Sequence, residues 1–144
     1  MRISAKTEYA CIAMLELATH FRSREPVQIR KIAERHDVPA RFLVQILLQL
    51  KAAGLVTSVR GAAGGYQLAT PPETVSLATV MDAIDGLSDE GGPHSSASSD
   101  SRAAKVLLQT WKRVDDVQRK MLDAITLADL LEMMSRQGEQ MYHI

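Results

Sequence analysis

Arginine and glutamine side chains occur in this chain at positions where they suit hydrogen bonding to the bases of nucleic acid. Arg41 and Gln45 follow Pro39 in a helical pattern, with Val44 beside them and Gln49 one turn further along. Arginine matches the two acceptors of guanine, glutamine matches the acceptor and donor of adenine, and valine matches the thymine methyl group. The alternative is a solvated helix surface, the usual setting of polar residues opposite a core face. The position just after Pro39 favours base contact, because the N-terminal turns of a recognition helix enter the major groove.

A second set of candidate DNA-contacting residues lies in the segment 58–66, where Arg60 precedes Gly61, Gly64 and Gly65. Residues 55–60 and 66–69 are predicted strands joined by a flexible tip. A narrow minor groove concentrates negative potential and attracts an inserted arginine. Glycine permits positive φ and a close approach of the backbone to phosphate. Nucleotide binding by these glycines is disfavoured, because no Lys-Ser/Thr pair follows them and a strand follows where a helix start is required.

Three helices, at residues 4–21, 28–36 and 40–53, are predicted ahead of the strands. Four apolar residues of the third helix recur at helical spacing and form its inward face: Leu43, Ile46, Leu47 and Leu50. Pro39 stops the second helix and fits the first turn of the third, so the two helices are joined by a tight turn. This order of helix, turn, helix and hairpin predicts a winged helix-turn-helix, a mainly α fold with a small β-wing that grips duplex DNA.

The ends of the first and third helices carry further signals. Ser4 is the predicted N-cap of the first helix, and Gly54 ends the third. Arg2, Lys6 and Tyr9 lie near the start of the first helix and are candidates for contact with DNA phosphates. Ordinary surface placement is the alternative for these three residues.

The chain divides into three predicted segments. Residues 1–86 form the DNA-binding domain and include a helix at 77–84. Residues 87–102 form a flexible loop, because the stretch 88–102 has no large apolar side chain to offset its ordering entropy. Residues 103–144 hold a long helix at 103–124 and a last short helix, for which Thr126 is the N-cap and Asp129 its capping-box partner.

The long helix carries an apolar stripe with spacings of four, three, three and four residues, made of Leu107, Trp111, Val114, Val117 and Met121. Two helices pack against each other through stripes of this kind. Packing within one chain is the alternative use. A single long helix beyond a compact domain favours contact between subunits, so we expect a homodimer.

Charge is distributed unevenly along the chain, although the formal net charge is zero. Residues 1–70 hold ten Lys or Arg and five Asp or Glu, whereas residues 71–144 hold seven and twelve. Such asymmetry favours a basic nucleic-acid face on the first half, and a chance pattern of solvated charges is the alternative. At 144 residues and 46% hydrophobic content, the chain can bury one core and still extend a dimerisation helix.

Cys11 is the only cysteine, which excludes an intrachain disulfide and a multi-cysteine metal site within one chain. Its apolar neighbours favour an inert packed thiol over a redox sensor, since reactive thiols need an accessible, electropositive setting. No signal-peptide pattern opens the chain, and no apolar window approaches the roughly 20 residues that span a bilayer. We therefore expect a cytoplasmic protein without membrane association.

Several motifs together resemble the Rrf2 family of bacterial transcription regulators. They are the opening residues 1–10, the helix segment 32–35, the stretches 42–47 and 50–56, and the hairpin residues 58–61 and 64–66. The resemblance covers residues 1–86, and residues 125–130 are similar to the family's final short helix. It implies a homodimeric winged-helix regulator of a palindromic operator, with a long helix crossing between subunits. It also implies base contacts for Arg41, Val44 and Gln45 and a minor-groove contact for Arg60.

The chain departs from the family at two places. Val44 stands where the cluster-assembly regulators carry a glutamate that affects site choice. Many members bind an iron–sulfur cluster with three loop cysteines, whereas residues 93–100 here include four serines and no cysteine, and hydroxyls replace thiolates poorly as cluster ligands. We therefore expect no cofactor and no metal. The alternatives are a site built from Glu8, Cys11 or His94 of both subunits, and serines introduced in place of native cysteines.

Taken together, these patterns predict a sequence-specific transcription regulator that represses by occluding promoter DNA. The signal is open among a small molecule in the dimer cleft, thiol chemistry at Cys11 and protein abundance alone. A winged helix that binds a partner protein is the rival interpretation. An enzyme is not expected, because His20, His36, His94 and His143 form no metal-spaced pair and no nucleophile–base motif is present.

Overall fold

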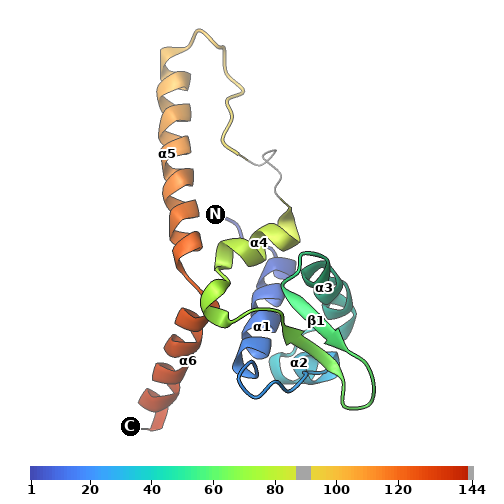
Figure 1. Cartoon of the computed structure of the whole chain (residues 1–144). Coiled ribbons are helices and arrows are strands. Elements are labelled where there is room, and N and C mark those ends of the chain that lie inside the picture. The colour runs from blue at the N-terminus through green and yellow to red at the C-terminus, as the bar shows by residue number, and fades with distance from the viewer. Residues whose placement is uncertain (87–91, 143–144) are drawn as a thin grey trace.

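The computed structural model describes residues 1–86 and 92–142 and is mainly helical (Figure 1). Its elements in chain order are α1 (Ala5–Thr19), α2 (Ile29–His36), α3 (Ala40–Ala52), β1 (Val56–Val59), β2 (Gly65–Leu68), the 3-10 helix η1 (Pro72–Thr74), α4 (Leu77–Asp85), α5 (Arg102–Ala124) and α6 (Leu127–Tyr142). The two strands form one antiparallel sheet. The predicted fold class, a mainly α chain with a small β-wing, is confirmed. We call residues 1–86 the winged-helix head.

Helix ends in the head follow the local sequence. The Ser4 side chain accepts a hydrogen bond from the Thr7 amide at 3.1 Å, as expected of an N-cap. Asp37 ends α2 in the left-handed conformation, with φ 53°. Pro39 then occupies the N-cap position of α3, and Gly54 follows that helix with φ 79°. The sharp turn between α2 and α3 therefore depends on Asp37 as well as on the proline.

The core of the head lies between α3 and the helices that pack on it, α1, α2 and α4. All four predicted inward residues of α3 are fully buried: Leu43, Ile46, Leu47 and Leu50. Met14 and Leu17 of α1 and Ile32 of α2 meet them. Because one face of α3 is committed to this core, its opposite face is left to solvent.

The wing is held against the rest of the head by backbone contacts. Val56 to Val59 pair with Leu68 to Gly65 in antiparallel register. Val27, just before α2, forms a β-bridge with Tyr66, exchanging two backbone hydrogen bonds of 2.9 Å. A Cβ atom on Gly65 would lie 2.5 Å from the Val27 carbonyl oxygen. Glycine at this position is therefore required by the close approach of two backbone segments.

The C-terminal helices lie on one side of the head (Figure 1). α5 projects beyond the head and contacts it through α4, whereas α6 continues from the end of α5 along the head and packs on α1 and η1. Leu127, at the start of α6, is fully buried in the core of the head. Backbone hydrogen bonds of 2.9 Å from Leu77 to Ile125 and from Leu127 to Val75 fix this junction.

The predicted capping box at the start of α6 is confirmed. The Asp129 amide donates to the Thr126 hydroxyl at 3.1 Å, and the Thr126 amide donates to the Asp129 carboxylate at 2.9 Å. The prediction of a short last helix was wrong, because α6 has 16 residues. Its length is supported by packing on α1 and η1, which the sequence pattern did not indicate.

The segment between α4 and α5 has no helix or strand in residues 92–101. The predicted flexible loop at 87–102 also includes residues 87–91, which lie outside the described residues. In the ranges that the structure describes, no helix combines the length and apolar character that crossing a membrane requires.

Candidate nucleic-acid interface

The outward face of α3 presents most of the predicted base-contacting side chains. Arg41, Val44 and Gln45 are exposed, opposite the buried leucines and isoleucine. Gln49 differs from them, because it is half-buried and its side-chain oxygen is shielded from solvent without a hydrogen-bond partner in the described chain. Among the predicted contact residues, the first two turns of α3 therefore expose one charged, one apolar and one amide side chain.

An aromatic residue that sequence reasoning missed lies on the same helix. The ring of Phe42 is 46% exposed. The Arg41 guanidinium carbon lies 5.0 Å from its centroid, and the centroid of Tyr9 lies 6.2 Å away at an interplanar angle of 30°. The available signal was the helical period itself, since Phe42 precedes the buried Leu43 and falls outside the inward face.

The wing arginine is accessible. Arg60 directly follows β1 and is exposed. The Lys51 ammonium donates to the Ser58 hydroxyl at 2.7 Å, which ties the end of α3 to the wing. The Gln28 side chain donates to the Ala62 carbonyl at 3.0 Å, which ties the start of α2 to the wing tip. The hairpin is thus braced against both helices of the helix-turn-helix.

The three wing glycines have different roles in the geometry. Gly61 is exposed at the tip with φ 105°. Gly64 is buried, and a Cβ atom there would lie 2.1 Å from the Val59 carbonyl oxygen. The close approach at Gly64 and Gly65 is therefore to the protein's own backbone.

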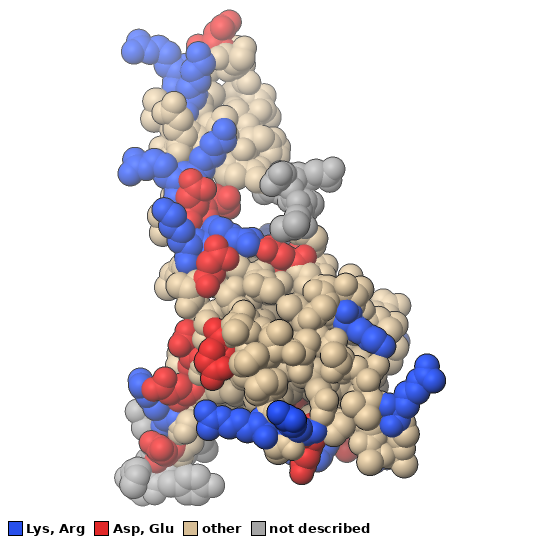
Figure 2. Space-filling view, viewed as in Figure 1, with Lys and Arg blue, Asp and Glu red and all other residues tan. Residues whose placement is uncertain are grey.

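Positive charge accompanies these surfaces. Arg2 and Lys6, near the start of α1, are exposed, whereas Tyr9 is half-buried and joins the α3 cluster through Phe42. Figure 2 shows Lys and Arg side chains projecting on the side of the head where the wing lies and also along α5, and Asp and Glu gathering around the meeting point of α4, α5 and α6. On this face of the molecule, α5 therefore carries both signs of charge.

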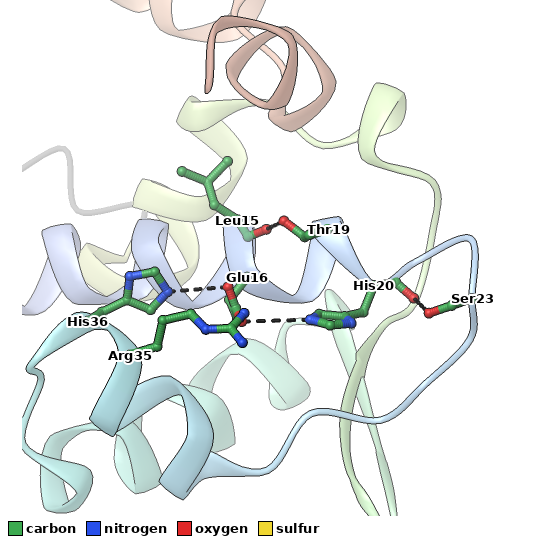
Figure 3. A network of polar contacts seen from close by, with 7 residues as sticks. All are labelled: Leu15, Glu16, Thr19, His20, Ser23, Arg35 and His36. Atoms are coloured by element: carbon green, nitrogen blue, oxygen red, sulfur yellow. Dashed lines mark hydrogen bonds and ion pairs between the residues drawn. The ribbon is translucent and has the colours of Figure 1, made fainter. Parts of the chain in front are cut away.

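A buried carboxylate fixes α2 against α1 (Figure 3). The side chain of Glu16 in α1 is only 6% exposed and pairs with Arg35 of α2. The His36 Nε2 atom lies 3.3 Å from one carboxylate oxygen, and the His20 Nε2 atom lies 3.6 Å from the other. A buried charge is tolerated only with such partners, so this network holds the first two helices in one arrangement.

The apolar stripe of α5 is exposed along the helix. Its members are 47–65% exposed: Leu107, Trp111, Val114, Val117 and Met121. Val106, Met133 and Met134 are further exposed apolar residues that the predicted stripe did not include. Near the C-terminal end of α5, the Arg119 guanidinium donates two hydrogen bonds to the Asp82 carboxylate of α4, at 2.7 and 2.6 Å. These bonds help to set the direction in which α5 leaves the head.

Cys11 is half-buried in α1, and burial together with the nearby Asp85 and Glu8 carboxylates raises the pKa of its thiol to about 11. A thiol with this pKa is protonated at neutral pH and is a poor ligand and nucleophile. Among residues 1–86 and 92–142, no three His, Cys, Asp or Glu side chains are grouped to hold a metal ion. The donor set of the described chain therefore does not fit an iron–sulfur cluster.

Comparison with known proteins agrees with this architecture. Residues 3–133 match the Rrf2 family model, described as iron-dependent transcriptional regulator. IscR of Cereibacter sphaeroides, an HTH-type transcriptional regulator, is 31% identical, with 92% of this chain and 88% of that protein covered. Among solved structures, CymR, the global cysteine regulator of B. subtilis, is 30% identical with a TM-score of 0.78, covering 92% of this chain and 98% of CymR.

T. potens IscR is 34% identical to this chain, with a TM-score of 0.75 over 93% of this chain and 88% of that one. The family match thus extends from the first helix into α6 and includes the elements that form the wing and the helix-turn-helix. These matches are to regulators of transcription and to no enzyme. With this fold and this extent of similarity, the chain belongs to the Rrf2 family of helix-turn-helix transcriptional regulators.

Proposed function

We propose that this protein is a cytoplasmic, homodimeric repressor that binds a palindromic operator and occludes promoter DNA. The observation that carries the proposal is the exposed face of α3, on which Arg41, Val44 and Gln45 point outward. The wing is held to α2 and α3 by side-chain hydrogen bonds and exposes Arg60 directly after β1. In a winged helix-turn-helix, such a face enters the major groove. Family membership supports the regulatory role.

Each residue type has a definite role in this proposal. Arg41 contacts guanine, Gln45 contacts adenine, and Val44 favours a thymine methyl group. Arg60 enters the minor groove. Arg2, Lys6, Tyr9 and the Gly61 backbone contact phosphates, which sets register without carrying sequence information.

Dimerisation is assigned to the segment 103–144, the head at residues 1–86 binds DNA, and residues 87–102 connect the two. The exposed stripe of α5 supports this division, because a monomer rarely leaves so many large apolar side chains in water. Two identical heads related by a two-fold axis match an operator with two-fold symmetry.

The proposed regulator works without a conventional iron–sulfur cluster. The chain has one cysteine, and its thiol is protonated at neutral pH. Relatives named IscR and CymR belong to the same family of regulators. Cys11 stays a structural residue in this proposal.

Fluorescence anisotropy of anaerobically purified protein tests the proposal, with labelled duplex from the region upstream of its own coding sequence. Wild type and Arg60→Ala are titrated at two salt concentrations, against a random duplex of equal length, and the absorption spectrum of the sample is recorded. Tight binding that weakens with salt and with loss of Arg60, from a colourless sample, supports a cluster-free DNA-binding regulator. Equal, weak binding to both duplexes contradicts sequence-specific binding, and a brown sample contradicts the absence of a cluster.

A further inference from the structure

The ring of Phe42 is placed outside the core although it belongs to a helix that supplies much of that core. Its exposed fraction is 46%, while the next residue, Leu43, is fully buried. The apolar contribution of α3 to the head comes from Leu43 and the three other inward residues. The exposed ring therefore adds little to the core, and the aromatic and cation–π contacts that it makes are with Tyr9 and Arg41.

These contacts join three side chains. Tyr9, half-buried on α1, lies next to the Phe42 ring, with centroids 6.2 Å apart and planes tilted by 30°. This distance is within the range of about 4.5–7 Å at which aromatic pairs attract. The Arg41 guanidinium carbon lies over the Phe42 ring at 5.0 Å, within the roughly 6 Å range of a cation–π contact.

The contact with the Phe42 ring restrains the Arg41 side chain. Within residues 1–86 and 92–142, no carboxylate pairs with Arg41, so Phe42 is the group that orients its guanidinium. A guanidinium stacked on a ring keeps its N–H donors for hydrogen bonds to other groups. An arginine that is already oriented loses less conformational freedom when it meets the two acceptors of guanine.

We propose that Phe42, supported by Tyr9, is a positioning residue that orients the Arg41 guanidinium for contact with a guanine edge. Recognition of that base pair then depends on an aromatic side chain next to the arginine that makes the hydrogen bonds. The inference rests on the proposed function, in which α3 enters the major groove. It adds a specificity determinant that is not itself a hydrogen-bonding group.

A double-mutant cycle tests the inference. The probe is the duplex that the full-length wild-type chain enriches from a randomised duplex library, together with duplexes that change each base pair of that site. Anisotropy gives the dissociation constants of wild type, Arg41→Ala, Phe42→Leu and the double variant. Arg41→Ala is expected to reduce discrimination at one guanine-containing base pair about ten-fold. Phe42→Leu is expected to reduce discrimination at the same base pair about two- to five-fold for each recognition helix.

The cycle distinguishes positioning from direct contact. In the Arg41→Ala background, the additional Phe42→Leu change is expected to have no further effect, whereas Phe42→Tyr in the wild type retains discrimination because the ring remains. An undiminished effect of Phe42→Leu without Arg41, or none in the wild type, overturns the inference. Glu73→Gln, which changes an exposed side chain of η1 outside the proposed DNA-binding and dimerisation surfaces, is the control, and thermal melting of every variant confirms that the head is folded.

Failure of the proposed function gives a different result. If the wild type enriches no sequence, sequence-specific binding is wrong. If a sequence is enriched but Arg41→Ala leaves discrimination unchanged at every base pair, the assignment of Arg41 is wrong and the inference falls with it.

Discussion

The winged-helix head and α5 use the same apolar periodicity with opposite results. In the head, the inward residues of α3 are fully buried between α1, α2 and α4. In α5 no residue is buried, and Trp111 is 53% exposed. Full burial of one large apolar side chain stabilises by about 1.5–3 kcal/mol, which α5 does not obtain within one chain. An amphipathic pattern thus predicts a buried face, and only the surrounding elements decide whether the same chain covers it.

The largest effect is expected from charges placed on the stripe of α5. The double variant Trp111→Glu, Val114→Glu should raise the dimer dissociation constant more than about 100-fold, because unpaired carboxylates would be buried at the interface. Sedimentation equilibrium measures this constant. The control Gln109→Glu, Lys112→Gln changes net charge equally outside the stripe and should leave the dimer intact. A dimer that survives the stripe variant would mean that another surface joins the subunits.

A core substitution should affect folding instead of assembly. Leu43→Ala is expected to lower the free energy of unfolding by about 2–5 kcal/mol, because it leaves a cavity in a fully buried site. Leu107→Ala, on the exposed stripe, should change it by less than about 0.5 kcal/mol. Both values come from urea denaturation at a concentration at which the protein is monomeric. Similar losses for the two variants would remove the contrast between head and α5.

The buried Glu16 carboxylate should contribute less to the free energy of unfolding than a core leucine, but more than a surface ion pair. Glu16→Gln is expected to lower the free energy of unfolding by about 1–2 kcal/mol, because Arg35 is half-exposed and regains water when its partner is neutral. Glu34→Gln removes a pair with Arg30 in which both side chains are exposed. This control should change stability by less than about 1 kcal/mol. Urea denaturation at pH 7 measures both, and equal effects would contradict a structural role for the network.

The smallest effect is expected at the cysteine. Because burial raises the pKa of Cys11 to about 11, the folded protein holds little thiolate at pH 7.5, and alkylation by iodoacetamide should be slow. The rate should rise as pH approaches this pKa, and DNA binding should be unaffected at neutral pH. A Gln109→Cys, Cys11→Ser variant places the thiol on exposed α5 and should react at the rate of an ordinary thiol. Fast alkylation of wild type at pH 7.5 would revive a thiol sensor.

Local features of the head were predictable from the sequence. The N-cap at Ser4, the inward face of α3, the two strands and the Thr126–Asp129 capping box all depend on residues within a few positions of one another. Such short-range geometry follows from helical and strand periods and from the hydrogen-bonding capacity of short polar side chains. The outward placement of Arg41 and Gln45 follows from the same period.

Features that depend on distant residues were not predictable in this way. Leu127 is buried in a core made by residues about 40 or more positions earlier, and α6 is long because it packs on α1. Glu16 meets Arg35 and His36 only after α2 folds back on α1. Phe42 has the composition of a core residue, and its exposure depends on which face α1 covers.

The junction of α5 with the head also sets a rotational phase. Backbone hydrogen bonds at Ile125 and Leu127 hold the end of α5 on the head, and α5 is one uninterrupted helix from there to Arg102. Each residue of a helix turns the next by about 100°, so one residue inserted before Ile125 would aim the stripe at a different side of the head. Seven inserted residues would return it to within about 20° of its present direction. The number of residues between the stripe and Ile125 thus fixes the angle between the stripe and the recognition helix α3. This angle does not depend on how many apolar side chains the stripe contains.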